Sequence, residues 1–443
     1  MTYQEALHHL YGLNRGGIRL GLENCSRVLD KLGNPQLKTL TIHIAGTNGK
    51  GSTAAFLQSI LSTAGYRVGL YTSPHLIDLR ERIRINDEWI GKADFVRLVS
   101  QVKTAVSQLG IPLSFFEFGT IVAFLYFFEK NNDINIIEVG LGGRLDATNV
   151  CQAEISILTS IALDHTEYLG SSLEQIAREK ALIVKDNGTV FAQLEDDAVF
   201  DIVRQIAQER SAKLFRLGTD FQVVPRGGNT RFQTIDFLKG NRKFRDLKLG
   251  LIGKHQASNA ALAISAALEL KRSGLEISDQ TIRKGLETTR LEGRLEVAGI
   301  RPAIILDCAH NPHSVISLTQ SVRELFSYQN CYLILGIMKD KPVREMLEIF
   351  IHFADHIILV KPQSERSEDP RKLKLELEPK HKNVEISQSV YHALQRAKQK
   401  AGPEDLICVS GSIFTVAEAK QALLPECRVA PHIDPSESFN IRR

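Results

Sequence analysis

The sequence has few of the features that mark a disulfide-rich or zinc-binding protein. Its 443 residues include only six cysteines, and no two of them form a C-x-x-C pair. A disulfide framework or a zinc site is therefore not expected, and we predict that most of the thiols are buried in a protein of a reducing compartment. The cysteines are Cys25, Cys151, Cys308, Cys331, Cys408 and Cys427.

An excess of one charge is also missing. The chain has 55 basic and 51 acidic residues, which gives a net charge of only +4. This balance provides no basic field that would attract nucleic acid. Nucleic acid is therefore not expected among the partners.

Long apolar segments are absent as well. The N-terminus, MTYQEALHHL, carries Glu5 and two histidines where a signal peptide needs an apolar segment. The longest apolar run, FGTIVAFLYFF from Phe118, stops at Glu129 and is well short of the ~20 residues that a membrane span requires. We therefore expect a buried helix in this run, and a cytoplasmic protein that does not enter a membrane.

The sequence does contain an alternation of apolar strands and amphipathic helices. Its length exceeds the size at which one core stops growing, so two domains are expected. Up to about residue 290, the alternation predicts a mostly parallel sheet with helices on both faces. The predicted strands are TLTIHIA, VGLYT, INIIEVG and EISILTS, and the predicted helices are STAAFLQSILSTAG, residues 118–130 and SLEQIAREKALIV.

Two later segments differ from this pattern. Between Asp220 and Leu251, polar alternation with Gly-Gly and Gly-Asn corners predicts an antiparallel patch on the first domain. The segment HQASNAALAISAALEL then predicts a helix whose small residues permit close packing.

The alternation of strands and helices restarts after LEGRLEVAG with AIILD, YLILGI, HIILV and DLICVS. It predicts a smaller, Rossmann-like α/β domain at the C-terminus. We predict a P-loop-type first domain at residues 1–292, a linker at 293–299 and the second domain at 300–443. About fifteen residues at the end, which include Pro431 and Pro435, are predicted to form a loose tail.

The segment TIHIAGTNGKGSTAAF, residues 41–56, places three glycines and a lysine between a predicted strand and a predicted helix. A glycine-rich turn of this kind aims several backbone N–H groups at one point, and the helix adds the positive end of its dipole. Lys50 makes such an anion site suitable for a triphosphate, and Ser52 or Thr53 can contact a phosphate or approach Mg²⁺. The alternative, a bare strand-to-helix turn, needs one glycine and none of these polar residues.

The corner G-T-N-G-K-G-S departs from the standard P-loop, which would require glycine at Ile44 and a hydroxyl at Gly51. This variant resembles the Mur ligase superfamily and, within it, the folylpolyglutamate synthase and dihydrofolate synthase family. Further segments are similar to that family in the same order, and together the matches run from about residue 40 to residue 417. They are YTSPHLIDLRERIRIN, IIEVGLGGRLDATN, ALDHTEYLG, REKALIVK, GKHQASNAALA, LEGRLE, LDCAHNPHS and SGSIFTVAEA.

Two predicted strand ends carry candidate metal ligands. Glu138 ends an apolar strand, where parallel sheets bind ligands, and Mg²⁺ prefers carboxylates together with phosphates. A helix-capping or salt-bridged acid is the alternative for Glu138, and a structural hydrogen-bonding residue is the alternative for His165. The resemblance implies that Glu138 and His165 bind Mg²⁺ together with Ser73. It also implies that Lys180, on spacing alone an ordinary solvated lysine, carries a carbamate that helps to hold a second Mg²⁺.

The resemblance also implies where the pterin-bearing substrate binds. Phe115 or Phe116 can stack on a pterin ring, although a core aromatic is an equal alternative for one of them. Arg144 and Asn149 form a polar cluster with Asp146 beside this region. The substrate residues implied are Ser114, Phe115, Phe116, Glu117, Leu145, Asp146 and Ala147.

The remaining matches concern the nucleotide. The resemblance implies that Asn259 contacts the nucleotide, that Arg294 contacts a phosphate and that Asp307 reaches the nucleotide from the second domain. Domain closure would bring the arginine onto the transferring phosphoryl group. The role of His310 stays open. The predicted ATP-binding set is Asn48, Gly49, Lys50, Gly51, Ser52, Asn259, Arg294 and Asp307.

Together these features predict an ATP-dependent carbon–nitrogen ligase. Phosphorylation of a carboxylate by ATP gives an acyl phosphate that an amine can attack, so the enzyme must position the reactants, neutralise charge and exclude water. The resemblance implies that the amine is L-glutamate and that the acceptor is a folate, with dihydropteroate as an open addition. Lys50, Lys180 and His165 are the predicted catalytic residues, ATP and two Mg²⁺ ions are the predicted cofactors, and the expected state is a monomer.

Two other functions remain open at this point. A Mur-type cell-wall amino-acid ligase usually has a separate N-terminal domain for its UDP-sugar, and the segment before Gly46 is short for one. A P-loop nucleotide-binding switch module would turn over nucleotide without glutamate and would lack a second domain with nucleotide contacts. No guanine-reading N-K-x-D motif follows the fourth predicted strand. Acceptance of dihydropteroate depends on the shape of the pocket around Phe116 and Asp146.

Overall fold

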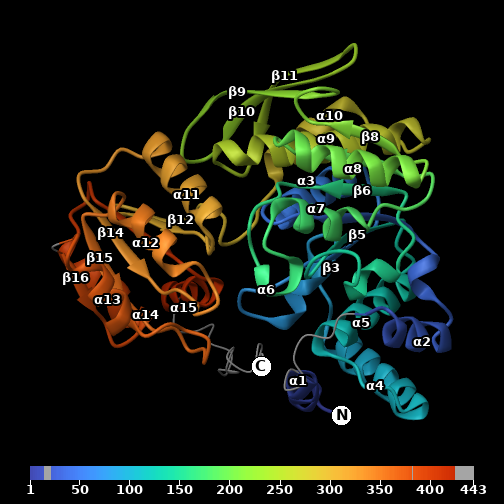
Figure 1. The fold of residues 1–443 in the computed structure, drawn as a ribbon, viewed down its shortest axis with the longest axis horizontal. Coiled ribbons are helices and arrows are strands. Elements are labelled where there is room, and N and C mark those ends of the chain that lie inside the picture. Colours follow the sequence, from blue (N-terminus) through green and yellow to red (C-terminus); the bar gives the residue numbers. More distant parts are fainter. Residues whose placement is uncertain (14–20, 382, 425–443) are drawn as a thin grey trace.

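The computed structural model describes residues 1–13, 21–381 and 383–424 of the chain. Cys427 and the predicted C-terminal tail lie outside the described residues. The chain forms two lobes, a larger one drawn from blue to yellow in Figure 1 and a smaller one in orange and red. Each lobe is built around its own sheet, as the sequence predicts.

The larger lobe contains an eight-stranded sheet in the order β4-β3-β2-β5-β1-β6-β7-β8. The six strands β2, β5, β1, β6, β7 and β8 are parallel to their neighbours. At one edge, β3 pairs antiparallel with β2, and β4 pairs antiparallel with β3. The four predicted strands form its centre, where burial on both faces requires apolar sequence. The strands are β1 Leu40–Ala45, β2 Val68–Tyr71, β3 Ile83–Ile85, β4 Glu88–Trp89, β5 Ile134–Glu138, β6 Ile155–Leu158, β7 Thr189–Ala192 and β8 Lys213–Arg216.

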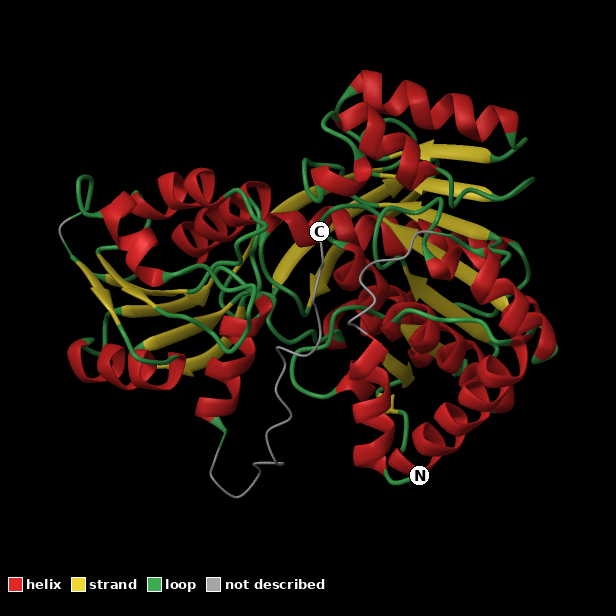
Figure 2. Cartoon of the chain, turned by 60° about the horizontal axis from the view of Figure 1, so that its bottom comes forward, coloured by secondary structure: helices red, strands yellow, loops and turns green. Residues whose placement is uncertain are grey.

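Helices cover both faces of this sheet (Figure 2). Successive strand residues point to opposite faces, so Ile136 and Ile137 of β5 belong to two different hydrophobic cores. One face packs against α3 Lys50–Thr63, α9 Lys254–Arg272 and α10 Asp279–Thr288. The other packs against α1 Tyr3–Gly12, α2 Glu23–Lys31, α4 Lys92–Leu109, α5 Phe115–Glu129, α7 Leu173–Ala181 and α8 Asp197–Glu209.

The helix predicted at residues 118–130 is confirmed, but it begins earlier, at Phe115. Ser114 accepts a hydrogen bond from the backbone nitrogen of Glu117, and the Glu117 carboxylate accepts one from the backbone nitrogen of Ser114. This reciprocal capping box starts the helix one turn before the continuous apolar run. The Ser114–Glu117 segment is therefore the first turn of α5.

The predicted antiparallel patch is confirmed as a separate three-stranded sheet of β9 Gln222–Gly228, β10 Gln233–Lys239 and β11 Arg242–Leu249. Its apolar face includes Phe237 and Leu247, which join the core formed with the alanine-rich helix α9. The patch therefore completes the larger lobe over α9.

The smaller lobe contains a six-stranded sheet in the order β12-β13-β17-β14-β15-β16. The strands are parallel except for β12, which pairs antiparallel with β13. β12 includes most of the predicted linker, and the exact domain bounds stay a prediction. The strands are β12 Glu296–Ile300, β13 Ala303–Leu306, β14 Cys331–Leu335, β15 His356–Leu359, β16 Val384–Ile386 and β17 Leu406–Ser410, and the helices are α11 Pro312–Leu325, α12 Val343–Ile351, α13 Pro370–Leu377, α14 Val390–Lys400 and α15 Ile413–Leu423.

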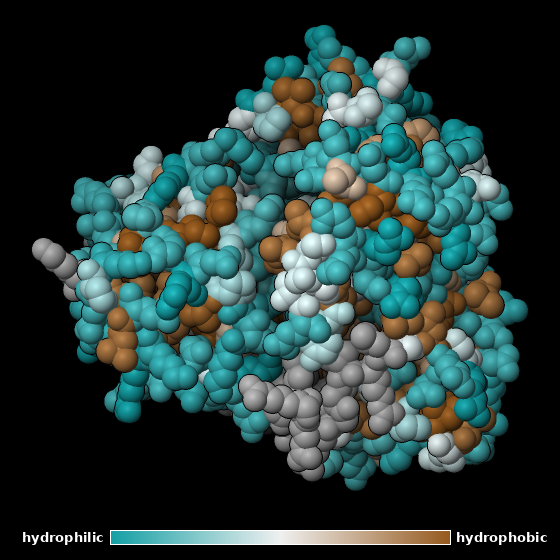
Figure 3. Space-filling model, viewed as in Figure 1, coloured by the Kyte–Doolittle hydropathy of each residue, from teal (hydrophilic) through white to brown (hydrophobic). Residues whose placement is uncertain are grey.

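Short elements complete the chain. They are the 3-10 helices η2 Pro35–Leu37, η3 Leu79–Arg82 and η4 Ala147–Val150 and the single-turn helix α6 Thr166–Leu169. The five cysteines within the described residues are buried free thiols, as predicted. Among the described helices, none combines the length and the apolar character needed to cross a membrane. Polar residues cover most of the face shown in Figure 3, with apolar patches between them.

Candidate active site between the two lobes

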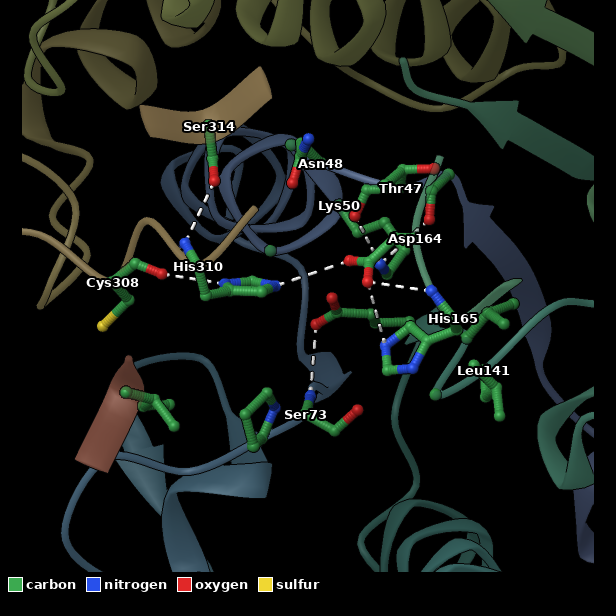
Figure 4. A pocket seen from close by; sticks show the side chains of 18 of the residues that line it. Thr47, Asn48, Lys50, Ser73, Leu141, Asp164, His165, Cys308, His310 and Ser314 are labelled. Atoms are coloured by element: carbon green, nitrogen blue, oxygen red, sulfur yellow. Dashed lines mark hydrogen bonds and ion pairs between the residues drawn. The ribbon is translucent and has the colours of Figure 1, made fainter. Parts of the chain in front are cut away.

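A cavity of about 430 Å³ lies where the carboxyl ends of the central strands face the smaller lobe. Every residue of the predicted ATP-binding, metal and substrate sets lines it, and so does His310. Figure 4 shows Lys50, Ser73 and His165 of the larger lobe around it, with His310 of the smaller lobe opposite. The parallel sheet therefore brings together residues that are far apart in the sequence.

The glycine corner connects β1 to α3, as predicted. Gly46 and Gly49 have φ angles of +146° and +91°, a region that favours glycine. A Cβ atom at Gly46 would collide with the side chain of Thr159, and one at Gly49 would collide with Asn259. Glycine is therefore required at both positions, because the φ angles are positive and neighbouring side chains leave no space for a Cβ atom.

Two lysine side chains converge on this corner. The Nζ atom of Lys50 donates to the backbone oxygens of Gly46 at 3.0 Å and Thr47 at 3.2 Å. The Nζ atom of Lys180 also donates to the Gly46 oxygen, at 3.0 Å. Burial lowers the pKa of Lys50, and burial together with the charge of Lys50 lowers the pKa of Lys180 to about 7. Lys180 is therefore no ordinary solvated lysine.

Glu138 ends β5 and faces the first turn of α3. Its carboxylate is 5% exposed and accepts one hydrogen bond, from the backbone nitrogen of Ser73 at 3.2 Å. Within the described residues it forms no ion pair and caps no helix, so the structure does not support either alternative role. Burial raises the pKa of Glu138, although the nearby Lys50 opposes this shift. The side chain therefore has spare oxygen lone pairs in a buried position.

His165 is the residue before α6, and its backbone has a φ of +51°. Its side chain is 38% exposed, yet partial desolvation within the cavity, followed by the positive charge of Lys341, lowers the pKa of its imidazole to about 4. The ring is therefore neutral near pH 7, the form in which histidine binds metals.

The donor set fits a magnesium site. In the described ranges, no three His, Cys, Asp or Glu side chains form a group that could hold a metal by themselves. Mg²⁺ needs no such group, because it usually takes one or two carboxylates and completes its shell with phosphates and water. Glu138, with its unshared oxygens beside Ser73 and the phosphate corner, matches that preference.

The two lobes meet at a polar cluster that the sequence did not predict, which we call the Asp164 cluster: Asp164, His310, Asn311 and Lys341. The Asp164 carboxylate lies 2.7 Å from the Nζ atom of Lys341 and accepts a hydrogen bond from the Nδ2 atom of Asn311 at 3.1 Å. The Nε2 atom of His310 lies 3.7 Å away (Figure 4). The side chains of Asp164 and Lys341 are only 8% and 6% exposed. A buried ion pair therefore joins the lobes.

The electrostatics of Asp164 are the reverse of those of Glu138. Burial opposes ionisation of Asp164, yet the neighbouring His310, His165 and Lys341 hold its pKa well below the usual range. Its carboxylate is therefore ionised, and its oxygens already interact with protein side chains.

Asn48 provides a second bridge between the lobes. Its Oδ1 atom accepts a hydrogen bond from Asn311 at 3.1 Å, and its Nδ2 atom lies 3.2 Å from the Nδ1 atom of His313. The glycine corner is thus connected directly to the N-terminus of α11. Any nucleotide bound at the corner must lie next to this junction.

Predicted nucleotide residues lie on both sides of that junction. Asn259 is buried on α9 and donates to the Oε1 atom of Gln256 at 3.0 Å. The carboxylate of Asp307 accepts hydrogen bonds from the backbone nitrogens of Leu295 at 2.8 Å and Ala309 at 2.9 Å. Arg294 forms no hydrogen bond or ion pair with the described residues, so its guanidinium is available to an anion.

The opposite end of the cavity is more apolar. The ring of Phe115 stacks on Tyr11, with centroids 5.9 Å apart and an interplanar angle of 8°, and belongs to the core. Phe116 is only partly buried and lies against Gly140, where any Cβ atom would meet its ring. Its ring centroid also lies 5.9 Å from that of Tyr71, so Phe116 contacts the core but is the more exposed aromatic side chain of the pair.

Asp146 closes this end. Its carboxylate is 4% exposed and accepts hydrogen bonds from the backbone nitrogens of Leu141 at 2.8 Å and Thr148 at 3.0 Å, and from the Thr148 hydroxyl. Burial raises the pKa of Asp146 even so. Leu145 and Ala147, on either side of it, also line the cavity.

Three residues considered with the site do not line the cavity. Thr53 is buried inside α3, so Ser52 alone of the two hydroxyl residues faces the cavity. Arg144 pairs with Glu179, its Nε atom 2.9 Å from the carboxylate, and Asn149 donates to the backbone oxygens of Arg144 and Leu182. Both residues hold the loop that carries Asp146.

Sequence reasoning missed several residues of the cavity. Asp164 precedes His165 in ALDHTEYLG, so its position after a strand was a usable signal. Lys341 lies in a loop of the smaller lobe, and nothing in its sequence indicates that it contacts Asp164. Arg82 and His255 also line the cavity, and their burial appears only in three dimensions.

The chain matches two domain families of Mur ligases. Residues 44–267 match the Mur ligase middle domain, and residues 293–413 match the Mur ligase glutamate ligase domain. The dihydrofolate synthase/folylpolyglutamate synthase of Bacillus subtilis is 33% identical over 95% of this chain and 99% of that protein.

Solved structures agree with these matches. The Escherichia coli FolC structure in complex with DHPP and ADP has a TM-score of 0.87 at 33% identity, over 96% of this chain and 98% of that one. A bifunctional folylpolyglutamate synthase/dihydrofolate synthase with Mn, AMPPNP and L-glutamate bound has a TM-score of 0.85 at 31% identity, over 96% and 98% of the two chains.

The two-lobed fold and the cavity that places the glycine corner beside the Glu138 carboxylate define an ATP-dependent ligase of the Mur type. Within that class, the chain belongs to the dihydrofolate synthase/folylpolyglutamate synthase family.

Proposed function

We propose that this chain uses ATP to join L-glutamate to the carboxylate of a folate. The observation that carries the proposal is one cavity that is lined by the phosphate corner, by Glu138 next to that corner, and by Phe116 and Asp146. In the proposed arrangement a nucleotide and an aromatic acid share this cavity, with the carboxylate of the acid meeting the γ-phosphate near Glu138.

The reaction first requires transfer of the γ-phosphoryl group to the acceptor carboxylate, which forms an acyl phosphate. In the proposed arrangement the backbone of the glycine corner and Lys50 hold the phosphates, and Arg294 approaches from the lobe junction. Glu138, Ser73 and His165 would hold Mg²⁺, which would supply positive charge to the phosphates. The amine of L-glutamate then attacks the acyl carbon, and phosphate leaves.

The lobe junction has a second task in this scheme, the exclusion of water. An acyl phosphate exposed to water would hydrolyse, so the cavity must stay closed until the amine arrives. The Asp164 cluster and the Asn48 bridge hold the lobes together around the position of the γ-phosphate.

Lys180 is proposed to act as a carbamate that holds a second Mg²⁺. Its buried Nζ atom already lies beside the glycine corner, and a pKa of about 7 leaves part of the amine in the neutral form that reacts with carbon dioxide. The same low pKa also reduces the cost of its burial beside Lys50.

We further propose that dihydropteroate is an acceptor. The support is the bifunctional name of the relatives from Bacillus subtilis and Escherichia coli, together with the partly exposed Phe116 in the lining of the cavity. The domain bounds 1–292, 293–299 and 300–443, a monomeric state and a cytoplasmic location complete the proposal as predictions of the sequence.

The two other functions are less well supported. A cell-wall ligase shares the Mur domains, but the relatives that match this chain over nearly its whole length carry folate-ligase names. A nucleotide switch has no use for a glutamate ligase domain.

The test is ligation by the purified chain with Mg²⁺, ATP and L-glutamate, with tetrahydrofolate or dihydropteroate as the acceptor. We expect release of ADP that depends on both acceptor and glutamate, and a product heavier by one glutamyl residue. If no ADP is released with either acceptor, the proposal is refuted. Release with tetrahydrofolate alone would refute only the dihydropteroate activity.

A further inference from the structure

Arg82 is a buried cation that the ligation scheme above does not use. It ends η3, just before β3, and its side chain lines the cavity with only 4% of its surface exposed. Arginine cannot shed its charge in a protein, and burial of an unpaired charge is strongly unfavourable. Burial indeed lowers the pKa of the Arg82 guanidinium. A group of this kind is expected to have an anionic partner.

Within the described residues, that partner is missing. The Nε atom of Arg82 donates to the Nδ1 atom of His75 at 2.9 Å, and the Nη2 atom is buried without a partner. Because the guanidinium can only donate, His75 must accept at Nδ1 and is therefore a neutral imidazole. The carbon atom Cζ also lies 5.1 Å from the centre of the Phe115 ring. None of these contacts supplies a negative charge.

Glu138 is close enough to raise the pKa of Arg82 but forms no hydrogen bond or ion pair with it, and the acids on the same loop are committed elsewhere. The carboxylate of Glu81 accepts hydrogen bonds from the backbone nitrogens of Leu76, Ile77 and Asp78. Asp78 is paired with Arg80, whose Nε and Nη2 atoms reach both of its oxygens, the latter at 2.7 Å. Two arginines on one loop thus differ sharply, since Arg80 has a full carboxylate partner and Arg82 has none.

Among the described residues, only Arg82 and His255 combine a buried side-chain nitrogen that has no partner with contact with the cavity, and burial lowers the pKa of His255 to about 4, so that its imidazole is neutral and needs no anion. The Nε atom of Arg84 is also buried without a partner, but Arg84 does not line the cavity. Arg82 does line it, with its guanidinium against the ring of Phe115 and close enough to Glu138 for the two charges to interact. It therefore lies near both Glu138 and the aromatic part of the cavity.

We propose that Arg82 binds a carboxylate of the acceptor and so fixes the reacting end of that substrate in front of Glu138. This inference rests on the proposed function, because the acceptor is the anion that occupies this end of the cavity. A guanidinium recognises a carboxylate by charge-assisted hydrogen bonds, and the free Nη2 atom supplies such a donor. In the proposed function the phosphates of ATP are held by a different part of the cavity, the glycine corner.

Two carboxylates have the required chemistry. One is the α-carboxylate in the glutamate tail of a folate, which does not react. The other is the carboxylate that receives the phosphoryl group, which dihydropteroate and folates both possess. Tetrahydrofolate has both carboxylates and dihydropteroate has only the second, so a comparison of these two acceptors shows which carboxylate Arg82 binds.

The test compares Arg82→Met, which removes the charge but keeps much of the length, with Arg82→Lys and with the control Arg80→Met. Arg80 lies on the same loop, does not line the cavity and tests the general effect of losing a positive charge there. For each variant we would measure the melting temperature without ligands and the KM values for tetrahydrofolate, dihydropteroate and ATP.

We expect Arg82→Met to raise the acceptor KM by about 10- to 100-fold, the value of a charged hydrogen bond, with the KM for ATP nearly unchanged. Arg82→Lys should restore part of the loss, and Arg80→Met should leave the acceptor KM near that of the wild type. The ligand-free melting temperature of Arg82→Met should be equal to or above that of the wild type, because an unpaired buried charge has been removed. A purely structural arginine would lower it.

The acceptors then identify the group that is bound. A raised KM for tetrahydrofolate alone assigns Arg82 to the α-carboxylate, and a raised KM for both acceptors assigns it to the reacting carboxylate. A lower melting temperature for Arg82→Met, with an acceptor KM no different from that of Arg80→Met, would overturn the inference alone. A wild-type protein that ligates neither acceptor would overturn the proposed function, and the inference with it.

Discussion

Glu138 ends β5 and Asp164 follows β6, the two strands that flank β1, yet the surroundings of these two buried carboxylates are opposite. Glu138 accepts one backbone hydrogen bond, and burial raises its pKa. Asp164 is paired with Lys341 and Asn311 across the lobe junction, and its pKa is held far below the usual value. The comparison indicates that one carboxylate is kept open for a ligand, while the other is already engaged in joining the two lobes.

The same distinction separates function from stability. A carboxylate with unused lone pairs in a buried place contributes little to folding and is available for a cation. A carboxylate with a buried ammonium partner would leave that partner uncompensated if it were removed. Substitution by the matching carboxamide should therefore have different consequences at the two sites.

The largest expected effect is on catalysis, at Glu138. Glu138→Gln should lower the rate of ligation by about 100- to 1,000-fold, because a carboxylate that neutralises phosphate-bound Mg²⁺ supplies several kcal/mol to the transition state. Steady-state ADP release at saturating Mg²⁺ would measure it. A variant that retains more than about a tenth of the wild-type rate would remove Glu138 from the metal site.

The second effect is on stability, at Asp164. Asp164→Asn leaves the buried Lys341 ammonium without its counter-charge, and the expected cost is about 3 to 5 kcal/mol in the free energy that holds the lobes together. Denaturant unfolding can be followed by tryptophan fluorescence and far-UV circular dichroism. It would show a lower free energy of unfolding or a first transition at a lower denaturant concentration. Unfolding identical to that of the wild type would show that the ion pair does not stabilise the junction.

A smaller, more specific quantity is the coupling between Asp164 and Lys341. In a double-mutant cycle of Asp164→Asn and Lys341→Met, the double variant should be more stable than the sum of the single effects predicts, by about 2 kcal/mol. Additive effects would contradict direct pairing across the junction.

The smallest effect is expected at an exposed pair that also bridges the lobes. Lys254 of α9 contacts Glu324 of α11, but their side chains are 69% and 41% exposed. Lys254→Ala should cost less than about 1 kcal/mol, and the cost should vanish in high salt, because solvent screens the pair. A large cost would mean that the position of a bridge, rather than its burial, determines its strength.

The parts of this site that follow directly from local sequence were predictable. The glycine corner and Glu138 each lie at the end of an apolar strand, and the carboxyl ends of parallel strands meet at one edge of a sheet. The resemblance then placed the remaining residues, and all of them line one cavity. Strand-end position and motif order were sufficient for this much.

Contacts created by the docking of the two lobes were not predictable. Lys341 is separated from Asp164 by 177 positions, and the pair exists only because one lobe closes on the other. The missing partner of Arg82 is also invisible in the sequence, where it looks like its neighbour Arg80. The short edge strands β8, β12 and β16 were missed for a related reason, since they are partly exposed and lack a continuous apolar run.

One measurement tests the central contrast most directly, namely the free energy of unfolding of the ligand-free Glu138→Gln and Asp164→Asn proteins beside the wild type. We predict that Glu138→Gln is as stable as the wild type or more stable, and that Asp164→Asn is clearly less stable. Equal losses in the two variants, or a greater loss for Glu138→Gln, would contradict it.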